Sequence, residues 1–219
     1  MRPEVLLTHG YFLDEDEKEQ EIMRPYPPLG MLYLSSYLKR EGFGVVVFDS
    51  TLRRRDELEA VFATEQGGVV GVYTTMMTRG SVVRMLAAAH EHGWTTVVGG
   101  PDASTHPARY LEHGADVVVL GEGEATLAEL IPILGRRGPH RLHGVLGTAF
   151  RSPDAELVTN PPRPRLADLD ALPLPDRTAI DVDSYLRVWR EHHGFGSLNL
   201  ITARGCAFRC RWCSHSVFG

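Results

Sequence analysis

The first 140 residues alternate short apolar runs with segments of helical periodicity. The apolar runs are "EVLLT", "VVVFD", "VVGVY", "TTVVGG" and "DVVVLG", and a helical pattern follows each of them. The runs are continuous in valine and leucine, which is typical of strands covered on both faces. This alternation predicts an open parallel sheet with right-handed crossovers, a doubly wound α/β fold.

Composition narrows the possible functions. A hydrophobic content of 43% is enough for a buried core, and the net charge of −5 argues against a basic nucleic-acid surface. No apolar run approaches the length of a membrane span, and the first residues lack a secretory signal pattern. We therefore expect a globular protein without a membrane span and without a nucleic-acid partner.

The pattern changes after residue 140. "HGVLGTAFRSPDAELVTN" predicts a β-hairpin that turns near residues 152–154, and the proline-rich "PPRPRLADLDALPLPDRTAI" predicts a linker laid along the surface. "SLNLITA" (residues 197–203) predicts a new strand that opens a second domain. We expect three parts: a Rossmann-like domain over 1–140, the hairpin and linker over 141–196, and the start of another domain over 197–219.

The acidic stretch "DEDEKEQE" (residues 14–21) has two interpretations. Its carboxylates could bind a metal, but nothing in their spacing fixes a coordination geometry. The composition favours a solvated, mobile loop.

All three cysteines lie in one loop after the predicted strand: Cys206, Cys210 and Cys213. An odd number of thiols in a single loop is a poor disulfide framework, so a reducing cytoplasm fits best. Thiolates at such close spacing can hold an iron–sulfur cluster, and three of them leave one iron of a cubane without a protein ligand. Two alternatives remain: a zinc site that adds His215, and three unliganded thiols.

The stretch "RGCAFRCRWC" resembles the cluster motif of the radical S-adenosylmethionine (radical SAM) enzymes, with Trp212 as the aromatic residue before the last cysteine. The preceding "LNLI" and "TARG" are similar to the first strand of that family's partial (β/α) barrel. The resemblance implies a 4Fe–4S cluster on Cys206, Cys210 and Cys213. It also implies S-adenosylmethionine on the fourth iron, and reductive cleavage to a 5′-deoxyadenosyl radical with electrons from a flavodoxin or ferredoxin type donor.

Glycines and small polar residues follow the third, fourth and fifth predicted strands. Ligands of open parallel sheets bind at this carboxyl edge, where glycine lets a flat ligand approach the backbone and hydroxyls bond its polar rim. The candidate cofactor-binding residues are Thr74, Thr75, Met76, Gly99, Gly100, Pro101, Ser104, Gly121, Glu122, Gly123 and Thr126. The alternative for each loop is a plain turn into the next helix, with Glu124 as a favourable acid at a helix N-terminus.

This part of the chain also resembles a known domain. "PYPPLGMLYLSSYLKREGF", "VVGGPDAS", "DVVVLGEGEATLAEL" and "LADLDALPLPDR" are similar to the cobalamin-binding domain and linker that precede radical SAM domains. Together the two resemblances imply a cobalamin-dependent radical SAM enzyme. That family includes methyltransferases acting on unactivated carbon, ring-forming enzymes and the oxygen-independent cyclase of chlorophyll synthesis.

One motif of cobalamin domains is absent. Many carry D-x-H-x-x-G after the first strand, whose histidine binds cobalt from below, whereas this chain reads "THGYFLDEDEKEQ". His9 stands there without the motif, so we do not expect it to bind cobalt.

The sequence thus favours an enzyme that acts on a small-molecule substrate, without naming its catalytic residues. The rival is a binding module, either a cobalamin carrier or a zinc-stapled α/β domain. A radical SAM barrel needs more strand–helix units than one strand and a cysteine loop. We therefore expect these residues to be an N-terminal fragment that binds cobalamin but does not turn over S-adenosylmethionine alone, with its last segment poorly packed.

Overall fold

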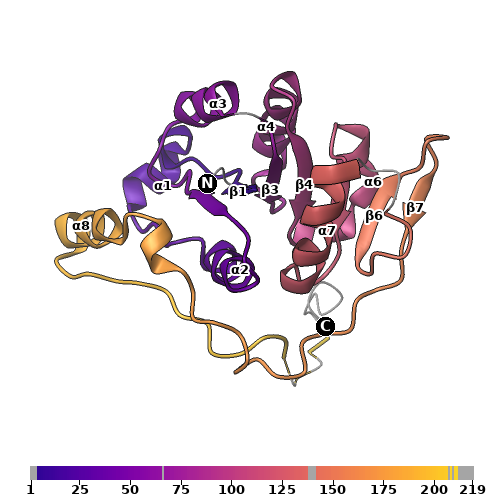
Figure 1. Cartoon of the computed structure of the whole chain (residues 1–219). Helices are drawn as coiled ribbons and strands as arrows, with labels where there is room; N and C mark the ends of the chain where they lie inside the picture. The colour runs from indigo at the N-terminus through magenta and orange to yellow at the C-terminus, as the bar shows by residue number, and fades with distance from the viewer. Residues whose placement is uncertain (1–3, 66, 138–141, 207, 209, 212–219) are drawn as a thin grey trace.

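The computed structural model describes residues 4–65, 67–137, 142–206, 208 and 210–211 (Figure 1). Their strands form one sheet in the order β2-β1-β3-β4-β5-β6-β7. The first five strands pair in parallel and the last two pair antiparallel. The strands are β1 Val5–His9, β2 Val45–Phe48, β3 Val69–Tyr73, β4 Thr95–Gly99, β5 Val117–Val119, β6 Thr148–Arg151 and β7 Leu157–Thr159.

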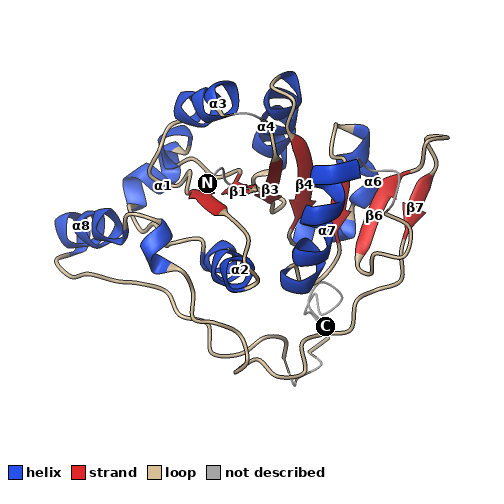
Figure 2. Ribbon diagram, in the orientation of Figure 1, coloured by secondary structure: helices blue, strands red, loops and turns tan. Residues whose placement is uncertain are grey.

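Helices cover both faces of the sheet, as Figure 2 shows. Buried residues of α2 (Leu29–Arg40) and α7 (Glu124–Arg137) pack on one face together with Val5 and Leu7 of β1. The opposite face carries Leu6 of β1 under α3, α4, α5 and α6. Neighbouring β1 side chains therefore point to opposite cores, which is why the apolar runs are continuous. The doubly wound fold predicted from the sequence is confirmed. The remaining helices of this part are α3 Arg55–Thr64, α4 Arg79–Glu91, α5 Pro101–Thr105 and α6 Pro107–Glu112.

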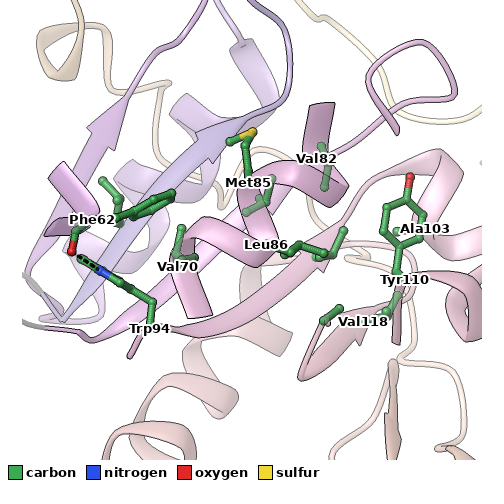
Figure 3. Close-up of a cluster of buried hydrophobic side chains, with 14 of the residues drawn as sticks. Phe62, Val70, Val82, Met85, Leu86, Trp94, Ala103, Tyr110 and Val118 are labelled. Carbon is green, nitrogen blue, oxygen red and sulfur yellow. Dashed lines mark hydrogen bonds between the residues drawn. The ribbon is translucent and has the colours of Figure 1, made fainter. Parts of the chain in front are cut away.

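Large side chains fill the core beneath α3 and α4 (Figure 3). The Trp94 indole donates a hydrogen bond to the Phe62 carbonyl at 3.1 Å, and the two rings lie 5.8 Å apart. The tryptophan thereby buries its apolar body while its one polar group keeps a partner. At the other end of the same cluster, the Tyr110 ring is fully buried beside Ala103.

The predicted hairpin forms and also extends the sheet. β6 pairs antiparallel with both β5 and β7. At its turn the Ala155 amide donates to the Ser152 carbonyl at 2.8 Å. The Asn160 side-chain nitrogen lies within hydrogen-bonding distance of the Leu142 and Val145 carbonyls and the Thr148 hydroxyl, which ties the end of β7 to the loop before β6 and to β6 itself.

Two short helices replace the mobile loop predicted over residues 14–21. η1 (Leu13–Glu15) and α1 (Glu17–Ile22) occupy this stretch, and the Asp16 side chain caps α1 by accepting from the Glu19 amide. The Arg55 guanidinium donates to both Glu15 carboxylate oxygens, at 2.7 and 2.8 Å. The prediction of a loop was wrong because a cap and a cation from α3 hold the acidic stretch in place.

The proline-rich linker is confirmed as a surface segment, and it ends in η3 (Arg177–Ala179). A helix that the sequence analysis did not predict follows, α8 (Val182–His193). Figure 1 shows the linker running from the hairpin to α8, and the chain then returning along the linker. Among the described residues, no helix is long and apolar enough to cross a bilayer.

The strand predicted over residues 197–203 does not form. A strand needs a neighbour for its backbone hydrogen bonds, and the described part of the chain places none beside it. The Leu200 side chain is 72% exposed, in agreement with the poor packing expected for this segment.

Candidate functional site

The parallel strands end level with one another at one edge. His9 of β1 pairs with Tyr73 of β3, and Tyr73 in turn pairs with Gly99 of β4. The order in which strands are added to the sheet reverses between β1 and β3. β2 lies on one side of β1, whereas β3, β4 and β5 follow one another on its other side. Open α/β sheets bind ligands at such a switch point, beyond the carboxyl ends of the strands. The structure brings the three glycine-containing loops to this edge.

The loop after β3 presents both a buried and an exposed part. The Thr74 hydroxyl is fully buried and lies 2.9 Å from the Tyr110 hydroxyl, while its amide donates to the Gly99 carbonyl. Thr74 therefore makes its hydrogen bonds inside the protein. Its hydroxyl was predicted to face a cofactor site, but it is buried. Thr75 is half-buried, and Met76 and Met77 are 72% and 84% exposed. Two exposed methionines give this loop an apolar, adaptable surface.

A buried carboxylate ties the loops after β3 and β4 together. Asp102 accepts from the Arg79 Nε at 2.7 Å and from Arg79 Nη2 at 2.5 Å. The Tyr110 hydroxyl also donates to Asp102, at 2.5 Å. The Arg79 hydrogen bonds lower the pKa of Asp102 to about 2, against the opposing effect of burial. Sequence analysis did not select Asp102 and Arg79. The signal was an acid inside "GGPDAS" opposite the arginine of "TTMMTRG".

The candidate glycines differ in what they permit. Gly100 has a φ of +107°, and a Cβ there would lie 2.4 Å from the Thr74 carbonyl oxygen. Gly100 is thus required by packing between two loops of the protein itself. A Cβ on Gly121 would meet no atom within 4 Å, and one on Gly99 would meet only the Val119 Cβ, at 3.8 Å. Internal packing therefore does not require a glycine at position 99 or leave any atom against position 121, so both positions have open space beside the backbone at the edge.

Other candidate residues contact the linker. The Thr126 hydroxyl is buried and accepts from Arg163 Nε at 2.8 Å. Glu122 accepts from the Leu166 amide at 2.7 Å, so Thr126 and Glu122 both bind the chain that follows the hairpin.

The remaining candidates follow β4 and β5 along the chain. The Ser104 hydroxyl is half-buried and accepts a long hydrogen bond of 3.4 Å from the Gly121 amide. The half-buried Pro101 begins α5, and Gly123 packs against Leu34 of α2.

His9 is enclosed by protein partners on both ring nitrogens. Its Nε2 lies 2.9 Å from an Asp49 carboxylate oxygen, and its Nδ1 accepts from the Tyr11 amide at 3.2 Å. Asp49 also accepts from the Tyr185 hydroxyl of α8 at 2.6 Å. Burial acts to raise the pKa of Asp49, but the hydrogen bonds from His9 and Tyr185 outweigh it and the pKa is lowered. Both ring nitrogens of His9 therefore have protein partners in this arrangement.

The cysteine loop is described only in part. Cys206 and Cys210 are free and exposed, and Gly205 before them has a φ of +77°. Cys213, Trp212 and His215 lie outside the described residues. Within the described part of the chain, no group of three or more His, Cys, Asp or Glu side chains is placed to hold a metal ion. Two exposed thiols on a short loop nevertheless suit a thiophilic iron centre, because thiolates are the donors that iron–sulfur clusters use.

The charged residues of the loop after β5 contact the cysteine loop. Arg204 Nη1 lies 3.3 Å from a Glu122 oxygen, and Arg204 Nη2 pairs with Glu124. Arg204 therefore ties the start of the cysteine loop to the loop after β5 and to the beginning of α7.

An open groove of about 390 Å³ lies elsewhere, near the end of β2. It is lined by η1, α1, residues 51–54 and His192 of α8. None of the predicted cofactor-binding residues contributes to its lining, so it is a separate surface feature.

Comparison with known proteins decides the family. The model of the B12 binding domain matches residues 21–131. This chain belongs to the B12-binding domain family. The matched residues hold β2 to β5 and the loops of the edge just described.

The relatives carry the likeness further along the chain. An uncharacterized methyltransferase of Pyrococcus horikoshii is 28% identical over 87% of this chain and 41% of its own length. The anaerobic magnesium-protoporphyrin IX monomethyl ester cyclase of Rubrivivax gelatinosus is 28% identical over 90% of this chain and 36% of its own length. The chain thus spans about two fifths of the length of these two relatives.

A solved structure shares the fold. The cobalamin-dependent S-adenosylmethionine radical enzyme OxsB, with aqua-cobalamin and S-adenosylmethionine bound, matches with a TM-score of 0.72 and 21% identity. The match covers 97% of this chain and 28% of that one. The predicted cobalamin-binding domain is therefore confirmed as a family, and the chain shares the fold of a cobalamin-dependent radical SAM enzyme.

Proposed function

We propose that this chain is the cobalamin-binding part of a radical SAM enzyme that transfers a methyl group to carbon or forms a ring. The observation that carries the proposal is the contact of Arg204, two residues before Cys206, with Glu122 and Glu124 beside the carboxyl end of β5 in a B12-binding domain. Cobalamin binds over residues 1–140, the hairpin and linker span 141–196, and the cluster loop lies in 197–219. The two β-hairpin strands belong structurally to the sheet.

The residues divide the task between them. Gly99 and Gly121 leave backbone open to the flat corrin, and Met76 offers an apolar contact at its rim. Thr75 and Ser104 are half-buried donors beside this surface, while Thr74 and Asp102 hold the loops in place. Cys206, Cys210 and Cys213 are the proposed cluster ligands. Cobalamin and a 4Fe–4S cluster with S-adenosylmethionine, when bound, supply the methyl carrier and the radical chemistry.

The surroundings of the enzyme follow from this chemistry. Exposed thiolate ligands require a reducing compartment such as the cytoplasm. Reductive cleavage requires a low-potential donor of flavodoxin or ferredoxin type. The substrate is a small molecule, and methyl transfer and cyclisation both remain within the proposal.

The cobalamin site is tested by titrating hydroxocobalamin and measuring the corrin absorbance kept after desalting. Gly99→Leu and Met76→Asp should each weaken retention, because both add atoms or charge at the open edge. Gly80→Leu is the matched control, since Gly80 lies on α4 and a Cβ there meets no atom within 4 Å. Full retention in both edge variants would place the corrin elsewhere.

The cluster is tested on the same protein after anaerobic reconstitution with iron and sulfide. Cys210→Ala should lose the broad visible absorbance that arises from sulfur-to-iron charge transfer in the cluster, and it should still bind cobalamin. A protein that takes up zinc and no iron would support the zinc-stapled binding module instead.

A further inference from the structure

Arg204 joins three separate elements. Its guanidinium pairs with Glu122 in the loop after β5 and with Glu124, the first residue of α7. The same group lies 5.8 Å from the centre of the Tyr33 ring on α2. The two ion pairs cross about 80 residues of sequence, so Arg204 connects the segment just before the cysteines to elements that are distant in the chain.

The Arg204–Glu124 pair is not an ordinary surface ion pair. The Glu124 side chain is 5% exposed and that of Arg204 is 28% exposed. Within the described residues, Arg204 supplies the one ion pair of Glu124. A buried carboxylate without a partner is strongly unfavourable, whereas exposed pairs contribute little. Glu124 therefore favours conformations in which Arg204 is docked.

Glu122 connects the same loop to the linker. One of its oxygens pairs with Arg204 and the other accepts from the Leu166 amide at 2.7 Å. Nearby, Arg163 pairs with Glu129 of α7 and with Thr126. Glu122, the neighbour of Gly121, thus contacts both the linker and the segment just before the cysteines.

We propose that Arg204 is a positioning residue that sets where the cysteine loop lies relative to the cobalamin edge. This inference rests on the function proposed above. Arg204 is two residues from Cys206, and its partners flank Gly123 and follow Gly121. Transfer between two bound groups requires them to be held at a fixed separation, and small displacements are costly. The ion pairs of Arg204 provide that constraint from the protein side.

Pulsed EPR tests the constraint directly. One nitroxide is attached to Cys206 in a Cys210→Ser, Cys213→Ser background, and a second to Glu59→Cys, an exposed position on α3. The distance distribution should be narrow, and Arg204→Gln and Glu124→Gln should each abolish the narrow component. Arg204→Lys should restore part of it. Arg211→Gln, an exposed arginine on the same loop, is the control and should leave it unchanged.

The second arm replaces the α3 label with bound cob(II)alamin as the spin partner. A narrow distance between cobalt and Cys206 that broadens in Arg204→Gln supports the proposal. An unchanged width in Arg204→Gln, in either arm, overturns it. If no cobalamin is retained, the proposed function fails, and the nitroxide pair still shows whether Arg204 holds the loop.

Discussion

Replacing Asp102 with asparagine tests how the candidate edge is held together. The Asp102 side chain is 3% exposed and receives hydrogen bonds from Arg79 and Tyr110. Its pKa is lowered from 3.8 to about 2, and a shift of that size corresponds to roughly 2 kcal/mol of folding free energy at neutral pH. Arg79 is about a quarter exposed, so solvent screens the pair and this figure is an upper bound for the charge alone.

Asparagine keeps the shape and one acceptor but loses the charge. We expect Asp102→Asn to lower the free energy of unfolding by about 2 kcal/mol at pH 7, below the roughly 3–5 kcal/mol of a fully buried pair because the Arg79 side chain is partly exposed. A folded-state pKa below the unfolded value stabilises the protein above about pH 4, and this contribution is lost as the pH falls through about 2. The wild-type and variant stabilities should therefore converge between pH 4 and 2.

Urea denaturation at a series of pH values, followed by tryptophan fluorescence, measures both quantities. Asp56→Asn is the control, because Asp56 forms an exposed pair with Arg54 and its loss should matter little. A difference between wild type and Asp102→Asn that stays constant down to pH 2 would refute the assignment of the effect to this carboxylate. A cost near zero at pH 7 would refute the anchoring role itself.

Three further predictions follow from other parts of the structure. Trp189→Ala should undock α8, because it removes a buried ring and its 2.8 Å hydrogen bond to the Pro25 carbonyl; we expect a loss of about 3 kcal/mol and faster amide exchange in α8. Gly100→Ala should destabilise by about 1–3 kcal/mol, since its Cβ would lie 2.4 Å from the Thr74 carbonyl oxygen, and unchanged urea midpoints would contradict this. His9→Asn should leave the EPR spectrum of bound cob(II)alamin unaltered, whereas a lost nitrogen splitting would identify His9 as a cobalt ligand.

Most of the sheet could be predicted from sequence because its strands are valine-rich and buried on both faces. The hairpin was predictable for a related reason, since a turn separates two apolar runs. Its pairing with β5 was not, because addition to a sheet edge depends on a partner strand that the local pattern does not identify.

The missed helix α8 and the wrong strand have opposite causes. α8 buries only Tyr185 and Trp189, so its apolar pattern is sparse. Both side chains bind segments far away in sequence, which the local pattern does not reveal. The Asp181 cap and the left-handed Gly194 were the available signals. Residues 197–203 carry a strong strand pattern, but strand formation depends on a partner that the pattern does not supply.

The candidate site shows the same limit at the level of side chains. The positions of Gly99, Gly121 and Met76 at one edge follow from strand order and register. That Thr74 and Thr126 are used internally depends on Tyr110 and Arg163, which reach them from other elements. Sequence patterns located the loops, while tertiary contacts decided which of their side chains face outward.

Elemental analysis of the desalted protein, after hydroxocobalamin loading and anaerobic iron–sulfur reconstitution, shows whether one chain binds both cofactors. We expect about one cobalt and about four iron atoms per chain, with no zinc. Gly99→Leu should lose cobalt and keep iron, and Cys210→Ala should lose iron and keep cobalt. Zinc in place of iron, or a protein without cobalt, would contradict the account.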